Sequence, residues 1–188
     1  MSETNPGTPL PPLSGGDQSA LARAASGWAP DLIGTLIFVV SGRQVLLIEK
    51  RTGHGAGLLN GPGGKLEGDE SPQACARREL QEELGVSCER LASTARLRFM
   101  DAAGAQWLGF AFRGDALSGI PTQSVEARPL WYPIGALPLN NMWPDDAIWL
   151  PRLLAGESFS ADLLLNGQRL LAWSVRPGTP ALTLDGEP

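Results

Sequence analysis

The segment from Gly64 to Val86 constrains the fold of this chain most, because it holds both ends of one helix and a cluster of acids between them. Ser71 followed by Pro72 predicts a helix start, since a serine side chain caps free backbone amides and proline fits the first helical position. Gly85 predicts the end of that helix. Three acids spaced i, i+3 and i+4 then project from one helical face, namely Glu79, Glu82 and Glu83.

This acidic face predicts a site for a divalent cation. Like charges so close together repel, and a hard cation such as Mg²⁺ both suits carboxylate oxygens and removes the repulsion. Arg78 falls beside Glu82 on the helical wheel and can hold the carboxylates in place. The preceding Gly61 to Gly64 lets the backbone approach an anion closely. The alternative interpretation is an exposed helix whose charges are only solvated.

The spacing of these residues resembles a complete Nudix box. Gly64 is followed after five residues by Glu70, and seven further residues lead to the run Arg78–Val86, with every fixed position of the box present. The resemblance implies an α/β/α sandwich with a central mixed β-sheet and a hydrolase that uses Mg²⁺, or Mn²⁺ as a substitute. The metal ligands that it implies are the Gly64 carbonyl, Glu79, Glu82, Glu83 and, outside the box, Glu126.

Size and charge limit the other classes of function. The chain of 188 residues is long enough for one domain with a substantial core plus tails. A net charge of −5 argues against broad nucleic-acid binding, which needs a basic surface. Cys75 and Cys88 lack metal-type spacing and fit two reduced thiols in a cytoplasmic protein. No membrane span or secretion signal is apparent, and nothing indicates an obligate assembly, so we expect a monomer that binds a small nucleotide.

We expect three parts along the chain. Residues 1–29 are predicted to be a disordered or loosely docked tail, because Met1 to Gly16 is rich in Pro, Gly, Ser and Thr. Within this tail, Ser19 to Ser26 could form a helical turn and Trp28 could dock on the domain. Residues 30–177 are predicted to form the domain, and residues 178–188 a C-terminal tail.

The pattern of the domain predicts mixed strands and helices, an α+β class. The Asn166-Gly167 pair favours a type I′ hairpin turn, and Pro151 implies that the last helix starts late or kinks. The predicted strands are Ile33–Val40, Gln44–Glu49 (a hairpin with the first), Pro62–Leu66, Leu91–Met100, Gln106–Arg113, Leu130–Pro133, Phe159–Leu165 and Arg169–Val175, and the last helix is Asp146–Ala155.

From about Leu32 to Pro177 the chain also resembles the MutT-type oxidised purine nucleoside triphosphatases, especially the animal form. The resemblance is carried by Gly55–Gly61, Glu126–Trp131 and Met142–Asp146. It implies hydrolysis of substrates such as 8-oxo-dGTP or 2-hydroxy-dATP to a nucleoside monophosphate and pyrophosphate, which sanitises the nucleotide pool and avoids DNA damage. Which modified purine is preferred, and whether dGTP is a substrate, stays open at this point.

The resemblance also implies roles for individual side chains. The Asn60 position reads the purine, Trp143 packs by the base, and Asp145 and Asp146 hydrogen-bond its edge. Adjacent carboxylates in a partly dry pocket cannot both ionise easily, so one can keep a proton and donate it to a carbonyl of an oxidised base. The alternatives are a helix N-cap for the aspartates, a core aromatic for Trp143 and an ordinary turn residue for Asn60.

Further candidates surround these residues. Glu83 or Glu126 would assist deprotonation of the attacking water, although Glu126 could equally be a surface charge. Lys65 can contact a phosphate oxygen, and His54 either flanks the base or is an exposed loop histidine. Pro62 departs from the animal pattern, where an aromatic residue stands. The rival functions are hydrolysis of another nucleoside diphosphate derivative, such as ADP-ribose or a dinucleotide, and a non-catalytic nucleotide-binding regulator.

Overall fold

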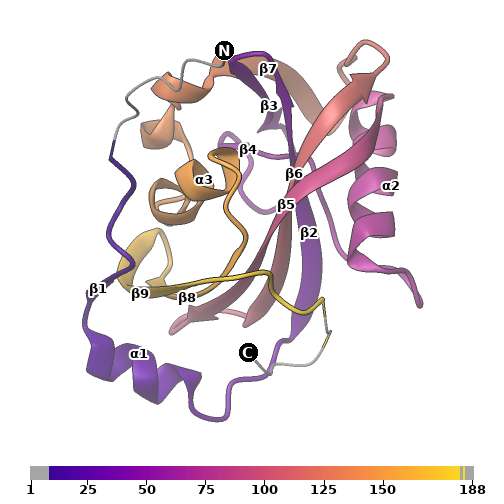
Figure 1. Cartoon of the computed structure of the whole chain (residues 1–188). Coiled ribbons are helices and arrows are strands. Elements are labelled where there is room, and N and C mark those ends of the chain that lie inside the picture. The colour runs from indigo at the N-terminus through magenta and orange to yellow at the C-terminus, as the bar shows by residue number, and fades with distance from the viewer. Residues whose placement is uncertain (1–8, 183, 185–188) are drawn as a thin grey trace.

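A computed structural model describes residues 9–182 and 184 of the chain (Figure 1). The three α-helices of this part are α1 (Gln18–Ala25), α2 (Pro72–Leu84) and α3 (Asp146–Leu154), and two short 3₁₀ helices, Ile134–Ala136 and Leu139–Asn141, precede α3. The strands are β1 (Ser14–Gly16), β2 (Leu32–Ser41), β3 (Gln44–Lys50), β4 (Leu59–Asn60), β5 (Ser87–Asp101), β6 (Trp107–Ser118), β7 (Ala127–Pro133), β8 (Phe159–Asn166) and β9 (Arg169–Pro177). Within these residues no helix combines the length and apolar character that a membrane crossing needs.

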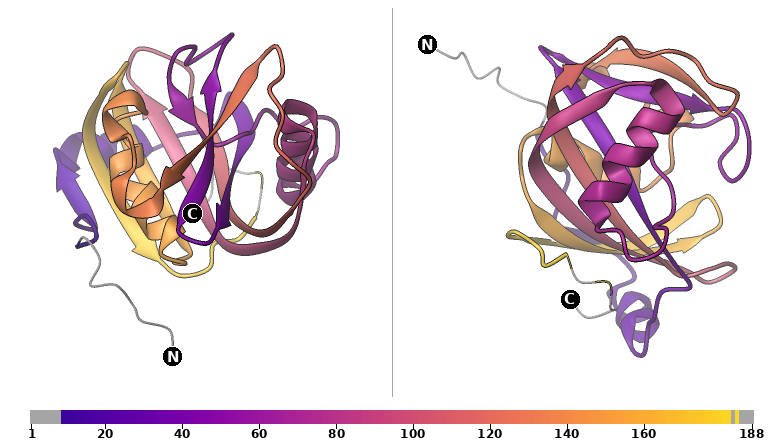
Figure 2. Two further views of the ribbon diagram at one scale, coloured as in Figure 1. Left: turned by 90° about the horizontal axis from the view of Figure 1, so that it is seen from above. Right: turned by 90° about the vertical axis from the view of Figure 1, so that its right-hand side faces the viewer.

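The strands form one mixed sheet in the order β1-β9-β8-β5-β6-β2-β3-β4, and β7 pairs with β3 outside this path. The pairs β2–β6 and β5–β8 are parallel, whereas β5–β6, β8–β9 and β3–β7 are antiparallel. Helices α2 and α3 lie on opposite sides of the strands (Figure 2). This arrangement confirms the predicted α+β class with a helix–sheet–helix sandwich.

Alternate residues of the central strands enter two separate cores. Phe38 of β2 packs in one core with Trp149 of α3, while its neighbours Ile37 and Val39 pack in the other with Leu80 of α2. Strand β3 divides in the same way. A strand covered on both faces must be apolar at every position, because successive side chains point to opposite faces. The continuous apolar runs in the sequence therefore specify both helix layers.

Strands β2 and β3 separate soon after their turn, so the predicted hairpin is short. Only Val40 and Ser41 of β2 pair with β3. The segment 61–66 then takes the place of β3, and the Thr35 amide donates to the Gly64 carbonyl at 2.8 Å. A Cβ atom on Gly63 would lie 1.9 Å from the Thr35 carbonyl oxygen, so no side chain fits at this close approach. The prediction of a regular strand here is wrong, since only a single bridge forms, between Gly34 and Lys65.

Two local expectations near the C-terminus have mixed outcomes. Helix α3 starts at Asp146, as predicted, and continues through Pro151, so the late start, one of the two alternatives for Pro151, is wrong. The β8–β9 loop consists of Gly167 and Gln168, because Asn166 pairs with Arg169. Gly167 has a φ of 56°, whereas Asn166 is not left-handed. A type I′ turn needs a left-handed φ at both central residues, but Gln168 is not left-handed. The turn therefore has the pattern of type II′, so the predicted hairpin is present but its type I′ turn is wrong.

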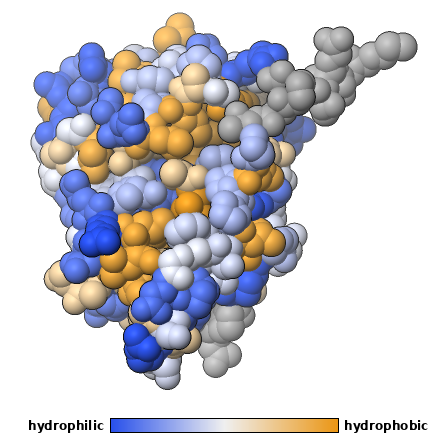
Figure 3. All heavy atoms as spheres, turned by 90° about the vertical axis from the view of Figure 1, so that its left-hand side faces the viewer, coloured by the Kyte–Doolittle hydropathy of each residue, from blue (hydrophilic) through white to orange (hydrophobic). Residues whose placement is uncertain are grey.

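The start of the chain is attached to the sheet edge from about Pro11 onward. Strand β1 pairs with β9, the Leu13 carbonyl accepts from the Val175 amide at 2.6 Å, and the Pro12 carbonyl accepts from Trp173 Nε1 at 3.2 Å. The Pro11 carbonyl accepts a hydrogen bond from the Arg152 guanidinium of α3. Figure 3 shows apolar patches between polar ones on the face that this segment crosses.

Helix α1 continues this attachment. Asp17 caps it by accepting from the Ala20 amide at 2.9 Å, and Leu21 packs against Met100 and Leu164 with an exposed fraction of 4%. Trp28 donates from its indole to the Phe99 carbonyl at 3.3 Å. The structure therefore agrees with the helical turn and the Trp28 contact expected within the tail, but differs from the expected disorder at residues 14–16. Residues 1–8 of the predicted tail lie outside the described part. Composition missed this attachment because most of it is backbone pairing to an open strand edge.

Replacing Leu21 by alanine tests whether α1 is held in solution. We expect the free energy of unfolding to fall by about 2–4 kcal/mol, because the truncation leaves a cavity among buried apolar side chains. Urea unfolding of the full chain measures this change. Leu10→Ala is the matched control, since Leu10 is 40% exposed and its truncation should cost no more than about 0.5 kcal/mol. Equal stability of the two variants would show that α1 is not docked.

Candidate active site

The helix that carries the acidic face has the ends that the sequence predicts. Ser71 Oγ accepts from the Ala74 amide at 3.2 Å, and Pro72 occupies the first turn of α2. Gly85 ends the helix with a left-handed φ of 70°. Both ends are confirmed, and they fix which face of α2 turns toward the glycine-rich segment.

The three box glutamates meet different environments. The side chain of Glu82 is 59% exposed, whereas that of Glu79 is 15% exposed and Glu83 as a whole is 6% exposed. Glu83 Oε2 accepts from the Gly63 amide at 3.0 Å. Burial is the largest influence on both inner carboxyls: it raises the pKa of Glu83 to about 7 and also raises that of Glu79. Two desolvated acids therefore lie where a cation would stabilise their charged forms.

Arg78 ties the acids of the box together. Its guanidinium contacts Glu70 at 2.7 Å, Glu79 at 2.9 Å and Glu82 at 3.0 Å, and it donates to the Lys65 carbonyl at 3.1 Å. The hydrogen bond from Arg78 lowers the pKa of Glu70 to about 2. The helical wheel predicts only the Glu82 contact, because Glu70 precedes the helix and reaches Arg78 through the fold of the loop.

The glycines of the box leave room for these carboxylates. A Cβ atom on Gly64 would lie 2.1 Å from Glu79 Oε1, so a side chain here would displace the glutamate. The Gly64 carbonyl accepts from the Thr35 amide at 2.8 Å, and the Cys75 thiol lies 3.8 Å from the same oxygen, a long contact that a cation could displace. Gly64 therefore has two functions: it admits Glu79 and it presents a backbone oxygen beside it.

The oxygen donors of the site fit a divalent cation whose coordination shell is completed by the substrate. Among residues 9–182 and 184, no three Asp, Glu, His or Cys side chains are gathered closely enough to hold a metal by themselves. Mg²⁺ is usually held by one or two carboxylates together with water and substrate phosphates. The buried, desolvated pair Glu79 and Glu83 meets that requirement, and the Gly64 carbonyl adds an oxygen of the hard type that Mg²⁺ prefers.

Two charged residues outside the box influence Glu83. Besides burial, the positive charge of Lys50 lowers the Glu83 pKa, and the negative charges of Glu79 and Glu126 raise it. Lys50 ends β3 opposite Ala127, the first residue of β7, so strand pairing brings Lys50 and Glu126 to one edge of the sheet. Sequence reasoning missed Lys50, because only the β3–β7 register places it beside the acids.

A stack of aromatic rings lies beside the sheet. The His54 ring is 4.9 Å from the Trp143 ring and 6.0 Å from the Trp107 ring by centroids, with interplanar angles of 20° and 19°. Lys65 Nζ lies 5.9 Å from the Trp107 ring centroid. Strand β2 brings Trp107 and Lys65 together, since it pairs with β6 on one side and with the Lys65 segment on the other. No motif in the sequence indicated Trp107.

The adjacent aspartates of the Trp-Pro-Asp-Asp segment are both buried, with exposed fractions of 3% for Asp145 and 2% for Asp146. Asp145 Oδ2 accepts from Trp149 Nε1 at 2.8 Å, and Asp146 Oδ2 accepts from the Trp143 amide at 3.1 Å. Asp145 makes no side-chain capping bond to the start of α3. Burial raises the pKa of Asp145, while burial and the charge of Asp145 raise that of Asp146 further. These contacts argue against the helix-capping alternative.

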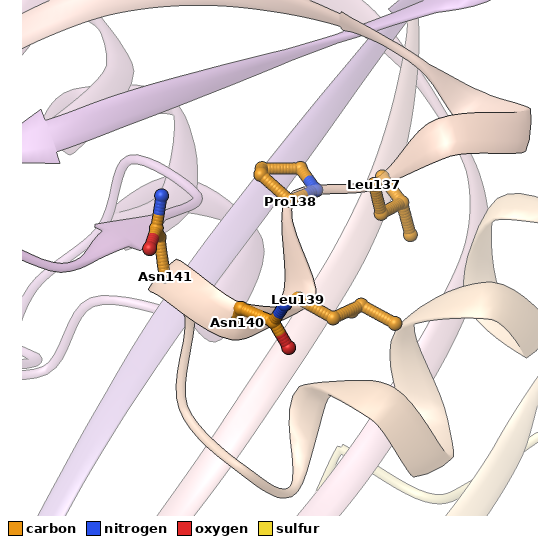
Figure 4. A pocket seen from close by; sticks show the side chains of 5 residues that line it. All are labelled: Leu137, Pro138, Leu139, Asn140 and Asn141. Atoms are coloured by element: carbon orange, nitrogen blue, oxygen red, sulfur yellow. The ribbon is translucent and has the colours of Figure 1, made fainter.

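Asn60 lies at the end of β4, where its Oδ1 accepts from the Gly61 amide at 2.8 Å. Within the described residues its side-chain NH₂ group has no hydrogen-bond partner. Its neighbour Leu59 packs in the same core as Met142 and Trp149, so β4 and the segment that carries the aspartates contribute to one core. A hollow of about 370 Å³ precedes that segment and is lined by Leu137–Asn141. Figure 4 shows Leu139 reaching toward α3 and Asn141 projecting away from it.

The box, the sandwich and this acidic face together define a Nudix protein. Residues 31–153 match the Nudix domain family, so the chain belongs to that family and is a Nudix hydrolase. Nudix hydrolases generally use divalent metal cations.

The chain is similar to relatives with a named activity. It is 35% identical over 144 residues to the oxidized purine nucleoside triphosphate hydrolase of Mus musculus, which covers 76% of this chain and 92% of the relative. The Danio rerio protein of that name is 38% identical over 138 residues, which covers 73% and 88%. Among solved structures, a MutT protein from Bacillus halodurans has a TM-score of 0.64 at 25% identity and covers 77% of this chain and 97% of that one. These findings confirm the family and the fold that the box implied.

Proposed function

We propose that this protein hydrolyses oxidised purine nucleoside triphosphates, of the 8-oxo-dGTP and 2-hydroxy-dATP type, to a nucleoside monophosphate and pyrophosphate. The observation that carries the proposal is the pair Asp145 and Asp146, buried with raised pKa values directly after Trp143 in a Nudix protein. The two vertebrate relatives, named as oxidized purine nucleoside triphosphate hydrolases, support the substrate class. The proposed enzyme acts as a cytoplasmic monomer on small nucleotides and does not bind nucleic acid.

The catalytic half of the proposal rests on the carboxylates of α2. Glu79 and Glu83, with Glu82, Glu126 and the Gly64 carbonyl, would hold Mg²⁺, for which Mn²⁺ can substitute. When bound, the metal supplies neutralisation of phosphate charge and a lowered pKa for water. Glu83 or Glu126 accepts a proton from the water that attacks the triphosphate, and pyrophosphate leaves with the electrons of the broken P–O bond.

Positioning residues complete this half. Arg78 fixes the orientation of Glu79 and Glu82 through its ion pairs, so the carboxylates do not need to reorganise during the reaction. Lys65 and Lys50 supply positive charge for phosphate oxygens.

The base-binding half rests on the buried aspartates. A carboxyl that keeps its proton can donate to a carbonyl oxygen of an oxidised guanine, while its ionised neighbour accepts from a ring N–H. Asn60 adds an amide NH₂ donor, and the indole of Trp143 offers a flat surface for stacking. Because either aspartate can hold the shared proton, one pocket can accept two different hydrogen-bond patterns.

The experiment that tests the proposed function is a comparison of kcat/KM for 8-oxo-dGTP and dGTP in Mg²⁺, with identification of the released phosphate species. We expect a strong preference for the oxidised base and release of pyrophosphate. Turnover without that preference would keep the hydrolase and remove the base assignment. Turnover only of ADP-ribose or a dinucleotide would replace the substrate class, and nucleotide binding without turnover would indicate a regulator.

The raised pKa of Glu83 predicts how Mg²⁺ and pH act together on stability. Folding lifts this pKa from 4.5 to about 7, so the folded state favours the protonated form. The stabilisation from Glu83 is therefore fully present below about pH 4.5 and is lost as the pH rises through about 7, by at most about 3 kcal/mol. Mg²⁺ binds the ionised form, so it should raise the melting temperature more at about pH 8 than at about pH 5.5.

Thermal unfolding with and without Mg²⁺ at both pH values measures this dependence. In Glu83→Gln the position cannot titrate, so most of the pH dependence of the Mg²⁺ effect should disappear. An equal Mg²⁺ effect at both pH values in the unsubstituted protein would show that Glu83 does not bind the metal.

A further inference from the structure

His54 lies within a stack of three nearly parallel rings. Its centroid distances to Trp143 and Trp107, 4.9 and 6.0 Å, fall in the range of about 4.5–7 Å that stacked aromatic rings adopt. The backbone of the same loop also approaches the indole, since a Cβ atom on Gly55 would lie 3.2 Å from Trp143 Cζ2. In the ligand-free protein, the face of Trp143 that turns toward the loop is therefore already covered.

A planar base that binds beside Trp143 would stack on the same indole face. Bases bind aromatic side chains by stacking ring on ring, and one face of an indole accommodates one ring at a time. An imidazole in the stacking position of Trp143 consequently competes with a base for the same surface. His54 makes no hydrogen bond to the described part of the chain that would lock it there, and its side chain is exposed to solvent.

We propose that His54 is a displaceable plug of the base-stacking position, which the nucleotide must move aside before its base can lie against Trp143. This inference rests on the proposed function, because it takes Trp143 as the residue that packs by the base. It adds that His54 competes with the base for the face of Trp143, so a base must bind strongly enough to displace the histidine.

The loop is built so that His54 can leave without disturbing the sheet. Gly53 and Gly55, on either side of His54, have left-handed φ values of 72° and 80°, which only glycine adopts at low cost. The base of the loop is closed by backbone hydrogen bonds between Lys50 and Gly57 at 2.8 Å and between Lys50 and Leu58 at 3.0 Å. Inside the loop, the Ala56 amide donates to the Gly53 carbonyl at 3.2 Å and the Leu58 amide to the Gly55 carbonyl at 2.9 Å. Neither bond involves His54, so its side chain can turn away while β3 and β4 stay paired.

The plug lowers the affinity for every base by the same factor. When a binding-competent state is only partly populated, the apparent dissociation constant rises by the inverse of that fraction, so a plug in place for about nine-tenths of the time weakens binding about tenfold. A base that gains hydrogen bonds from Asp145 and Asp146 after entry overcomes this, whereas a base that only stacks does not. His54 thereby raises the threshold for every base.

Nuclear magnetic resonance can detect the position of the His54 ring directly, because His54 is the only histidine in the chain. In untagged protein, ring currents of the two indoles should shift the His54 imidazole Cε1–H signal well upfield of its position in the urea-unfolded chain. Trp143→Leu should remove part of that shift. Saturation with 8-oxo-dGMP, the product of the proposed reaction, should move the signal toward its unfolded position. An unshifted signal in the free protein, or a shifted signal that stays in place in the saturated complex, would overturn the plug.

Binding of 8-oxo-dGMP to variants gives an independent measurement. Calorimetry should find that His54→Ala binds several-fold more tightly than the unsubstituted protein, with Thr52→Ala of the same exposed loop as the matched control. Weaker binding by His54→Ala would show that the histidine supports the base instead of competing with it.

The resonance experiment also separates the plug from the proposed function. If 8-oxo-dGMP moves no resonance of the protein at all, the proposed function fails. The signal of the free protein and its Trp143→Leu control still decide whether His54 covers Trp143.

Discussion

Glu83→Gln is expected to lower kcat by about three orders of magnitude or more while the protein still folds. Glutamine keeps the size of the side chain and an oxygen that can accept from the Gly63 amide, but it cannot take a proton or neutralise a cation. A positioned general base contributes about 10²–10⁴-fold, and loss of a metal ligand adds to this. Kinetics with 8-oxo-dGTP in saturating Mg²⁺ measure the effect.

The control for this variant is Glu89→Gln, because Glu89 is an exposed glutamate on β5 with no assigned role. Its turnover should match that of the unsubstituted protein. Urea unfolding without metal should show that Glu83→Gln is at least as stable, since the substitution removes a carboxyl whose charged form burial disfavours. Turnover retained by Glu83→Gln would remove the box from the mechanism.

Asp145→Asn is expected to raise KM for 8-oxo-dGTP about tenfold or more, or to reduce its preference over dGTP, with little change in the Mg²⁺ dependence. Asp145 Oδ2 accepts from Trp149 Nε1, so the amide oxygen of asparagine should keep that bond and its NH₂ group must take the place of Oδ1. The position then only donates to the base and can no longer accept or share a proton. One mismatched hydrogen bond of this kind changes discrimination by about 1–3 kcal/mol.

Steady-state kinetics with both nucleotides, repeated over a Mg²⁺ titration, test this prediction. Asp69→Asn makes the same chemical change at an exposed aspartate in the loop before α2 and should alter neither base preference nor KM. An unchanged base preference in Asp145→Asn would refute the role of this aspartate in recognition. A changed Mg²⁺ dependence would instead place it with the metal.

The sequence predicted the helix that carries the acidic face well, because the signals for it are local. Ser71, Pro72 and Gly85 set the ends of α2 through contacts within a few residues, and the spacing of the glutamates then puts them on one face. The proposed base-binding residues were reached only through the resemblance of Met142–Asp146, since helix capping was the better interpretation of the local chemistry of Asp145 and Asp146. Only the contacts with Trp149 and Trp143 decided against capping.

Tertiary structure decided the features that join distant segments. The Glu70–Arg78 ion pair, the approach of Lys50 and Glu126 to Glu83, and the stack of His54 with Trp107 each depend on how loops cross the sheet, and no local pattern encodes these crossings. The attachment of β1 to β9 is of the same kind, because backbone hydrogen bonds to a sheet edge leave little mark in the side-chain sequence.

The sequence by itself determined the helix that carries the acids, the two-sided burial of the strands and the membership of the Nudix family, because periodicity, caps and spacing act over a few residues. The tertiary structure decided how deeply each acid is buried, and with it which carboxyls have raised pKa values. Desolvation depends on everything packed around a group. Glu82 and Glu83 are adjacent in the sequence, yet the side chain of the first is exposed to solvent and the second is buried.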